Sequence, residues 1–113
     1  MLETRTIGNV IIARVKEGNR LNALVSDTVK GELTDFFARP GVNLVFDLQG
    51  ITFIDSSGFG VFLAAMKAAG NNYGQFKVCN VNPGVMELFK LLQLHHVFEI
   101  YDELDPCIES FGV

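Results

Sequence analysis

The sequence predicts a single α/β domain with a mixed, mostly parallel central sheet of four to five strands and about four helices. From Val42 onward, short apolar stretches alternate with amphipathic stretches of helix length, which indicates parallel strands joined by helical crossovers. Before them, two strand-like runs separated by Gly8-Asn9 indicate a hairpin, and this hairpin adds antiparallel pairing at one edge. The 113 residues are 49% hydrophobic and 19% charged, without linkers or repeats, so residues 1–113 form one domain around one core.

The first elements in chain order are the hairpin and a helix. Strands are expected over Glu3 to Ile7 and Val10 to Lys16. The polar stretch 17–20 separates the second strand from the helix that follows. Arg39-Pro40-Gly41 ends that helix, because proline disfavours helical geometry in the preceding residue. The apolar stripe that faces the core consists of Val25, Val29, Leu33, Phe36 and Phe37.

Two strand-like runs, 42–48 and 51–54, then lead into a helix over 58–69 that carries almost no charge. Helical spacing predicts one buried face made of Phe59, Phe62, Leu63 and Met66. Small apolar residues lie on the other faces, namely Gly58, Val61, Ala65 and Ala68. A solvated helix would carry more Lys and Glu, so either another protein or the adjacent helix covers these small residues.

The last third of the chain continues the alternation. A strand is expected over 75–81, and a helix begins near Pro83 with the stripe Val85, Leu88, Phe89 and Leu92. His95-His96 at its end interacts favourably with the helix dipole and predicts no further role. After a short strand over 97–101, Asp102 or Asp105 caps a terminal helix. Its residues Leu104, Ile108 and Phe111 are expected to dock on the core.

Composition excludes several functional classes. The net charge is −4 and the nine basic residues are scattered from Arg5 to Lys90, which argues against nucleic acid as a partner. The start of the chain lacks the apolar core of a signal peptide, and the apolar run 59–66 is too short to cross a bilayer, so we expect a cytoplasmic protein without membrane contact. Cys79 and Cys107 lack metal-site or redox spacing, and we expect buried, reduced thiols, no metal and no cofactor.

The candidate site is Asp55-Ser56-Ser57-Gly58, where an apolar strand opens into a helix. Asp55 or Ser56 is the expected N-cap, which places Ser57 in the first turn with its hydroxyl near solvent. The first turn favours anions, so Ser57 can carry a phosphate without unfolding the helix, although Asp55 opposes that charge. The simpler interpretation is that the four residues form only a helix cap.

These residues resemble the anti-sigma-factor antagonist family, the free-standing STAS domains of bacteria. The similarity rests on segments that cover nearly the whole chain: Leu44-Val45-Phe46-Asp47-Leu48, Ile54-Asp55-Ser56-Ser57-Gly58-Phe59-Gly60-Val61, Val78-Cys79-Asn80-Val81 and Val85-Met86-Glu87-Leu88-Phe89. In the family's Asp-Ser-Ser-Gly or Asp-Ser-Thr-Gly motif, the residue before the glycine is phosphorylated. The resemblance therefore implies that Ser57 is the phosphorylated residue.

The resemblance also implies partner switching in the regulation of transcription and the stress response. The unphosphorylated protein binds an anti-sigma factor and releases the sigma factor. The anti-sigma factor is a histidine-kinase-like serine kinase whose phosphorylation of Ser57 ends binding, and a serine phosphatase is an expected second partner. The implied partner-binding residues are Asn22, Asp55, Ser56, Ser57, Gly58 and Val61. Asn22 departs from the acidic residue that many members carry at this position, which bears on the choice of kinase or on phosphorylation itself.

Two other classes remain to be distinguished. The first is a constitutive STAS binding subunit of a transporter or stress-signalling complex, which needs the same surface but no phosphorylation cycle. The second is an enzyme or nucleotide-binding protein, which the sequence disfavours: the Gly-x-Ser-x-Gly elbow is incomplete, both histidines lie at the end of another helix, and no phosphate-binding loop is present. We therefore expect a binding protein and not an enzyme.

Overall fold

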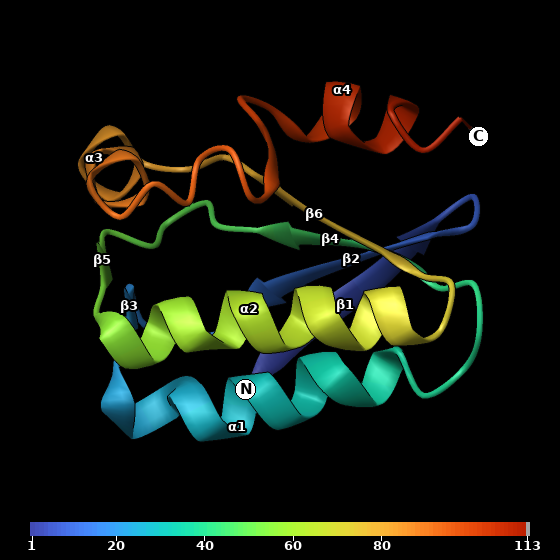
Figure 1. The fold of residues 1–113 in the computed structure, drawn as a ribbon, viewed down its shortest axis with the longest axis horizontal. Coiled ribbons are helices and arrows are strands. Elements are labelled where there is room, and N and C mark those ends of the chain that lie inside the picture. The colour runs from blue at the N-terminus through green and yellow to red at the C-terminus, as the bar shows by residue number, and fades with distance from the viewer. Residues whose placement is uncertain (113) are drawn as a thin grey trace.

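The computed structural model describes residues 1–112 and contains one central sheet of five strands in the order β1-β2-β4-β6-β7. These strands are β1 (Leu2–Ile7), β2 (Val10–Val15), β4 (Asn43–Asp47), β6 (Gln75–Cys79) and β7 (Glu99–Tyr101). The β1–β2 hairpin is antiparallel, whereas β2, β4, β6 and β7 pair in parallel. The predicted fold class is therefore confirmed (Figure 1).

A second, two-stranded sheet lies beside the main one. Arg20–Leu21 (β3) pairs in parallel with Phe53–Ile54 (β5), and this pairing joins the segment before α1 to the segment before α2. The sequence analysis assigned Arg20 to a polar break and did not predict this strand. The strand has only two residues, and only Leu21 is apolar and buried. The additional pair is the element that brings two helix N-termini together.

Four helices cover the two faces of the sheet. Ala23–Phe36 (α1) and Ser56–Asn71 (α2) lie side by side on one face, and Pro83–Leu91 (α3) completes that core through Phe89, which contacts Phe59 of α2. Leu104–Glu109 (α4) lies on the opposite face (Figure 1). Its Cys107 is buried with residues of β2, β4 and β6 that point away from α1 and α2.

A cluster of phenylalanines fixes the position of α2. Phe62 is fully buried, and its ring centroid lies 5.5 Å from that of Phe89 and 5.6 Å from that of Phe46. Phe59, Phe76 and Phe98 complete its aromatic surroundings. Aromatic pairs at such separations add about 0.5–1.5 kcal/mol beyond the area that they bury. The cluster therefore anchors the helix that carries the candidate serine to strands, to α3 and to the segment before β7.

The predicted buried face of α2 is partly wrong. Phe59 and Phe62 are buried as expected, but Leu63 is 42% exposed. The small residues Val61 and Ala65 are instead almost fully buried. Helix α2 packs against both the sheet and α1, so two of its sides are covered and the small residues permit the close approach of α1. Of the two explanations for these small residues, the adjacent helix is the correct one.

The terminal helix docks as predicted, but neither aspartate caps it. Glu103 occupies the N-cap position without a side-chain hydrogen bond. Lys77, only 4% exposed, holds the end of the chain: its Nζ lies 2.9 Å from Ser110 Oγ, 3.0 Å from Glu99 Oε2 and 4.3 Å from the centre of the Phe111 ring. Leu104, Ile108 and Phe111 pack on the cluster around Cys107, which confirms that prediction.

The two cysteines are free and buried, as expected. They belong to the same cluster on the α4 face of the sheet, where the Cys107 side chain and burial together raise the pKa of the Cys79 thiol. Within residues 1–112, no three side chains are grouped in a way that would hold a metal ion. In the same part of the chain, no helix has the length and apolar character needed to span a bilayer.

Candidate functional site

Asp55 is the N-cap of α2, which decides between the two predicted caps. Its backbone is extended, with φ −99° and ψ −174°, and its Oδ1 accepts a hydrogen bond from the Gly58 backbone N–H at 3.1 Å. Ser56 and Ser57 are therefore the first two helical residues, and both side chains are exposed. Ser57 lies in the first turn beside solvent, as the sequence predicted.

Asp55 also connects α2 to α1. Its second carboxylate oxygen, Oδ2, accepts from the backbone N–H of Ala23, the first residue of α1, at 3.2 Å. Its own N–H donates to the carbonyl of Leu21 in β3 at 3.3 Å. One carboxylate thus satisfies unpaired N–H groups at two helix N-termini, a favourable position for a negative charge.

The Ser57 hydroxyl has two polar neighbours. Its Oγ lies 2.5 Å from Asp55 Oδ1 and 3.2 Å from the Oγ of Ser26, a residue that is only 4% exposed. Ser26 donates its single hydroxyl proton to the Asn22 carbonyl at 2.6 Å. Since a carboxylate can only accept, Ser57 must donate its own proton to Asp55.

This network stabilises the ionised form of Asp55. The hydrogen bond from Ser57 is the largest influence that lowers the pKa of Asp55, and the Gly58 and Ala23 amides add to it. The carboxylate is thus held as an acceptor for three donors at the head of the two helices. A group so arranged is a poor proton donor and a good anchor for the first turn.

Gly58 allows α2 to approach the small sheet closely. A Cβ at this position would lie 2.3 Å from the Leu21 carbonyl oxygen and 2.7 Å from Cγ2 of Ile54. Such contacts are far shorter than van der Waals distance, and one of the two atoms belongs to the backbone. The glycine of the motif is therefore required by packing, and it does not itself offer a side chain to a partner.

Asn22 is the N-cap of α1 and lies in the same site. Its side-chain oxygen accepts from the Leu24 N–H at 3.1 Å, and its carbonyl is bonded to Ser26, which contacts Ser57. The neutral amide is as effective at this cap as an aspartate would be. The structure thus links Asn22 to Ser57 through Ser26 across 35 positions of sequence, in line with what the family resemblance implied.

The structure changes the predicted set of partner-binding residues. Val61 is only 1% exposed within the core, so a partner cannot reach it, and the expectation for this residue is corrected. Two exposed apolar side chains of the segments around the site, Leu24 at 90% and Phe53 at 40% exposure, were not among the predicted residues. The exposure of Leu24 had one available signal in the sequence: it lies at the start of an expected helix, where core-facing stripes rarely begin. Nothing in the sequence singled out Phe53, over which the Arg20 guanidinium lies at 5.1 Å.

Comparisons with known proteins agree with this fold. The STAS domain family matches residues 1–106. The anti-sigma F factor antagonist of Paenibacillus polymyxa is 33% identical over 94 residues, which cover 82% of this chain and 79% of that protein. An anti-sigma-factor antagonist (STAS) domain protein from Planctomyces limnophilus superimposes with a TM-score of 0.86 at 14% identity, covering 99% of this chain and 98% of the other. The phosphorylated form of SpoIIAA, the Bacillus cell fate determinant, superimposes with a TM-score of 0.70 at 16% identity, covering 98% and 99%.

Fold and sequence together define a STAS domain, and the chain belongs to the STAS domain family. Its curated relatives carry the name of anti-sigma factor antagonists, which are regulatory binding proteins and not enzymes. The predicted family and the prediction that the chain is not an enzyme are both confirmed.

Proposed function

We propose that this protein is an anti-sigma-factor antagonist whose binding is ended by phosphorylation of Ser57. In its unphosphorylated form it binds an anti-sigma factor and so releases a sigma factor. The observation that carries the proposal is the exposed Ser57 hydroxyl at the joined N-termini of α1 and α2, where a solvent-facing serine follows an aspartate cap. The name of the relative from Paenibacillus polymyxa, an anti-sigma F factor antagonist, supports the choice of partner.

The proposed contact surface surrounds Ser57. It combines the exposed Ser56 and Ser57 with two apolar side chains, Leu24 and Phe53, that belong to the adjoining first turn of α1 and to β5. Exposed apolar residues beside polar groups that can be paired are typical of protein contact sites. Asp55 and Asn22 act here mainly by fixing the two helix ends that carry this surface.

Phosphorylation would alter this surface in two ways. It replaces the proton that Ser57 donates to Asp55, and it adds roughly −1.5 to −2 charges next to that carboxylate. A partner that covers the site must then remove water from an unpaired dianion beside Asp55, at a cost on the order of a few kcal/mol. That cost is large enough to end binding, since each 1.4 kcal/mol is about tenfold in affinity.

The proposed kinase is the anti-sigma factor itself, a histidine-kinase-like serine kinase, and a serine phosphatase would restore the binding form. That SpoIIAA, a protein of the same fold, has been solved both unphosphorylated and phosphorylated supports a cycle of this kind. The backbone at the N-termini of α1 and α2 should stay unchanged through this cycle, because the phosphate replaces only the hydroxyl proton of the exposed Ser57.

The test is a pull-down from a lysate of the source organism with Ser57→Ala and Ser57→Asp as paired baits, followed by mass spectrometry. We expect a kinase-like anti-sigma factor to be retained by Ser57→Ala and lost from Ser57→Asp. The retained kinase, supplied with ATP, should then phosphorylate the wild-type chain and the matched control Ser56→Ala but not Ser57→Ala. Phosphate on Ser56, or equal retention by both baits, would contradict the proposal.

A second candidate is a constitutive STAS binding subunit of a transporter or stress-signalling complex. Two observations favour it. Ser57 is part of the cap network, donating to Asp55 and contacting Ser26, so the hydroxyl has a structural use without any kinase. Asn22, which replaces the acidic residue common at this position, points the same way. Equal retention of one partner by both Ser57 baits would establish this candidate in place of the first.

A further inference from the structure

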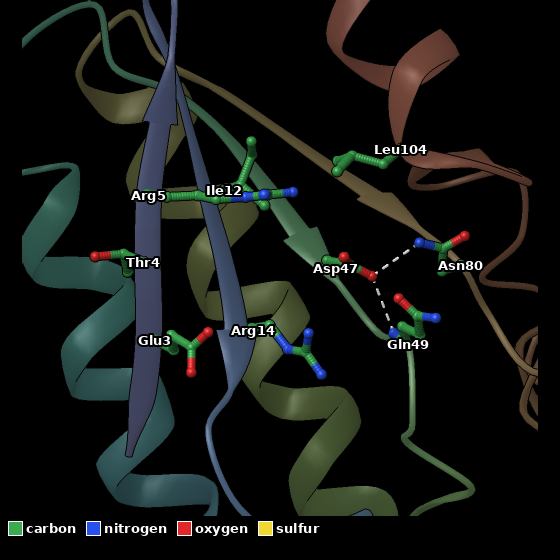
Figure 2. A pocket seen from close by; sticks show the side chains of 9 residues that line it. All are labelled: Glu3, Thr4, Arg5, Ile12, Arg14, Asp47, Gln49, Asn80 and Leu104. Carbon is green, nitrogen blue, oxygen red and sulfur yellow. Dashed lines mark hydrogen bonds between the residues drawn. The ribbon is translucent and has the colours of Figure 1, made fainter.

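The face of the sheet opposite to α1 and α2 is only partly covered, and a pocket of about 210 Å³ lies on its open part. Helix α4 covers β6 and the adjoining strands, and the pocket lies between its first residue, Leu104, and the side chains of β1 and β2 (Figure 2). None of the residues around Ser57 lines this pocket. It is therefore separate from the proposed partner-binding surface.

One side of the pocket carries two arginines and one glutamate, Arg5, Arg14 and Glu3, and Glu3 is the register partner of Arg14. Arg5 of β1 reaches across β2 beside Ile12, and Arg14 extends from β2 toward the β4 side (Figure 2). Arg5 lies opposite Ile12 in the hairpin register, and Arg14 is two positions beyond Ile12, so the two guanidinium groups come from the same face. Neither forms an ion pair with a carboxylate of residues 1–112, since the ion pairs in that range involve other groups. Their hydrogen-bond donors remain available to a bound anion.

The opposite side of the pocket is anionic. Asp47, at the end of β4, is only 5% exposed, and its Oδ1 accepts from the Gln49 N–H and from Asn80 Nδ2, each at 3.0 Å. Its Oδ2 receives no hydrogen bond from a nitrogen or hydroxyl group of residues 1–112, while the thiol of its register partner Cys79 lies close to the carboxylate. Asp47 is the register partner of Arg14, yet their charged groups are more than 4.0 Å apart. A buried carboxylate in this state favours a cationic partner.

Ile12 and Leu104 complete the pocket with apolar surface. Ile12 is 2% exposed on β2, and Leu104 of α4 points toward it from above (Figure 2). A cavity of this volume is below the roughly 300–1,000 Å³ of pockets for drug-sized ligands, so only a small molecule fits. The lining thus offers two guanidinium groups, two carboxylates and an apolar surface within a small space.

We propose that this pocket binds a small zwitterion, an α-amino acid with a short aliphatic side chain. Its carboxylate lies against Arg5 and Arg14, its ammonium group donates to Asp47 Oδ2, and its side chain contacts Ile12 and Leu104. A simple anion would be placed beside the buried carboxylate of Asp47, and a simple cation beside two guanidinium groups. Only a molecule that carries both charges meets all three contacts favourably.

The test is a titration of the ¹⁵N-labelled full chain with L-valine, followed by NMR. We expect saturable shifts of amides in β1 and β2 and of the Asn80 side chain at millimolar concentration. Isobutylamine and isovalerate, which are valine without its carboxylate and without its amine, should produce no saturable shifts at these positions. Absence of saturation with L-valine, or equal binding of either truncated compound, would overturn the proposal.

Variants test the assigned contacts. Arg5→Gln and Asp47→Asn should each weaken L-valine binding by at least about tenfold, because each removes one charge-assisted contact. Asparagine retains an acceptor for the Gln49 and Asn80 groups, so the fold is preserved, and the NMR spectrum verifies this. Arg39→Gln, an exposed arginine outside the pocket, is the matched control and should bind normally. Normal binding by a folded Arg5→Gln chain would refute the assignment.

The outcome is independent of the proposed partner switch. Ser57→Asp changes the α1–α2 side of the sheet and should leave L-valine binding unchanged. Loss of valine binding in that variant would contradict the separation of the two sites and overturn the inference. Loss of anti-sigma-factor binding in the same variant bears only on the proposed function.

Discussion

Replacing Gly58 by alanine should destabilise the protein, whereas the same change at Gly60 should stabilise it. The added Cβ at Gly58 would approach the Leu21 carbonyl oxygen to 2.3 Å, while nothing lies within 4 Å of a Cβ at Gly60. Both glycines belong to α2, so each substitution gains about 0.5–1 kcal/mol of helix propensity. Overpacking costs about 1–3 kcal/mol, and a contact with backbone falls at the upper end. We therefore expect Gly58→Ala to lose about 2 kcal/mol in free energy of unfolding.

The assay is urea denaturation followed by circular dichroism for the wild type and both variants. The two variants should differ by about 3 kcal/mol in free energy of unfolding. In a thermal melt, Gly58→Ala should lower Tm by roughly 8 °C, at about 4 °C for each kcal/mol in a domain of this size. Gly60→Ala controls for the general effect of alanine in this helix. A Gly58→Ala protein as stable as the Gly60→Ala protein would refute the argument that packing on Leu21 requires the glycine.

Two further predictions concern the charged side chains of Lys77 and Asp55. Lys77→Ala should lower the free energy of unfolding by about 1–2 kcal/mol, because the hydrogen bonds to Ser110 are lost. Hydrogen exchange of backbone amides should increase more in α4 than in β4. An equal increase in both elements would contradict the anchoring role of Lys77. Asp55 has a pKa below its ordinary 3.8, so its stabilising contribution is complete above that value and is lost as the pH falls through the lower folded pKa. Asp55→Asn should therefore show a weaker loss of stability in acid than the wild type in urea titrations at several pH values, and an unchanged pH profile would count against the network.

Much of the fold could be predicted because its signals are local. The Gly8-Asn9 turn and the alternation of strands and helices determined the sheet, since hydrophobic periodicity is contained in short windows of sequence. The faces of α2 could not be assigned in the same way. Leu63 and Phe62 are both apolar, but Phe62 is buried against the sheet and α3 whereas Leu63 is exposed. Which side of α2 faces the sheet is decided by tertiary packing and has no local signature in the sequence.

The candidate site was predicted in part for a related reason. Its motif and its cap are contiguous in sequence, so the place of Ser57 in the first turn followed from known preferences at helix N-termini. The bond from Ala23 to Asp55 and the contact between Ser26 and Ser57 join segments more than 30 residues apart. These depend on the pairing of β3 with β5, two strands of two residues each that periodicity cannot reveal.

The pocket on the other face of the sheet had no signal in the sequence at all. Arg5, Arg14 and Asp47 come from three different strands, and each is an ordinary residue in its own segment. The hairpin register sets Arg5 and Arg14 on one face, and the parallel register then brings Asp47 beside Arg14.

The arrangement around Asp55 explains why one serine is suited to regulation while its neighbours are constrained. Asp55 must remain an acceptor for two helices, and Gly58 must remain small beside Leu21, so changes at either position affect the fold itself. Ser57 lies between them with an exposed hydroxyl, and a modification there leaves the backbone bonds of both caps in place. A charge added at Ser57 therefore changes the surface that a partner meets much more than the stability of the domain, as reversible control of binding requires.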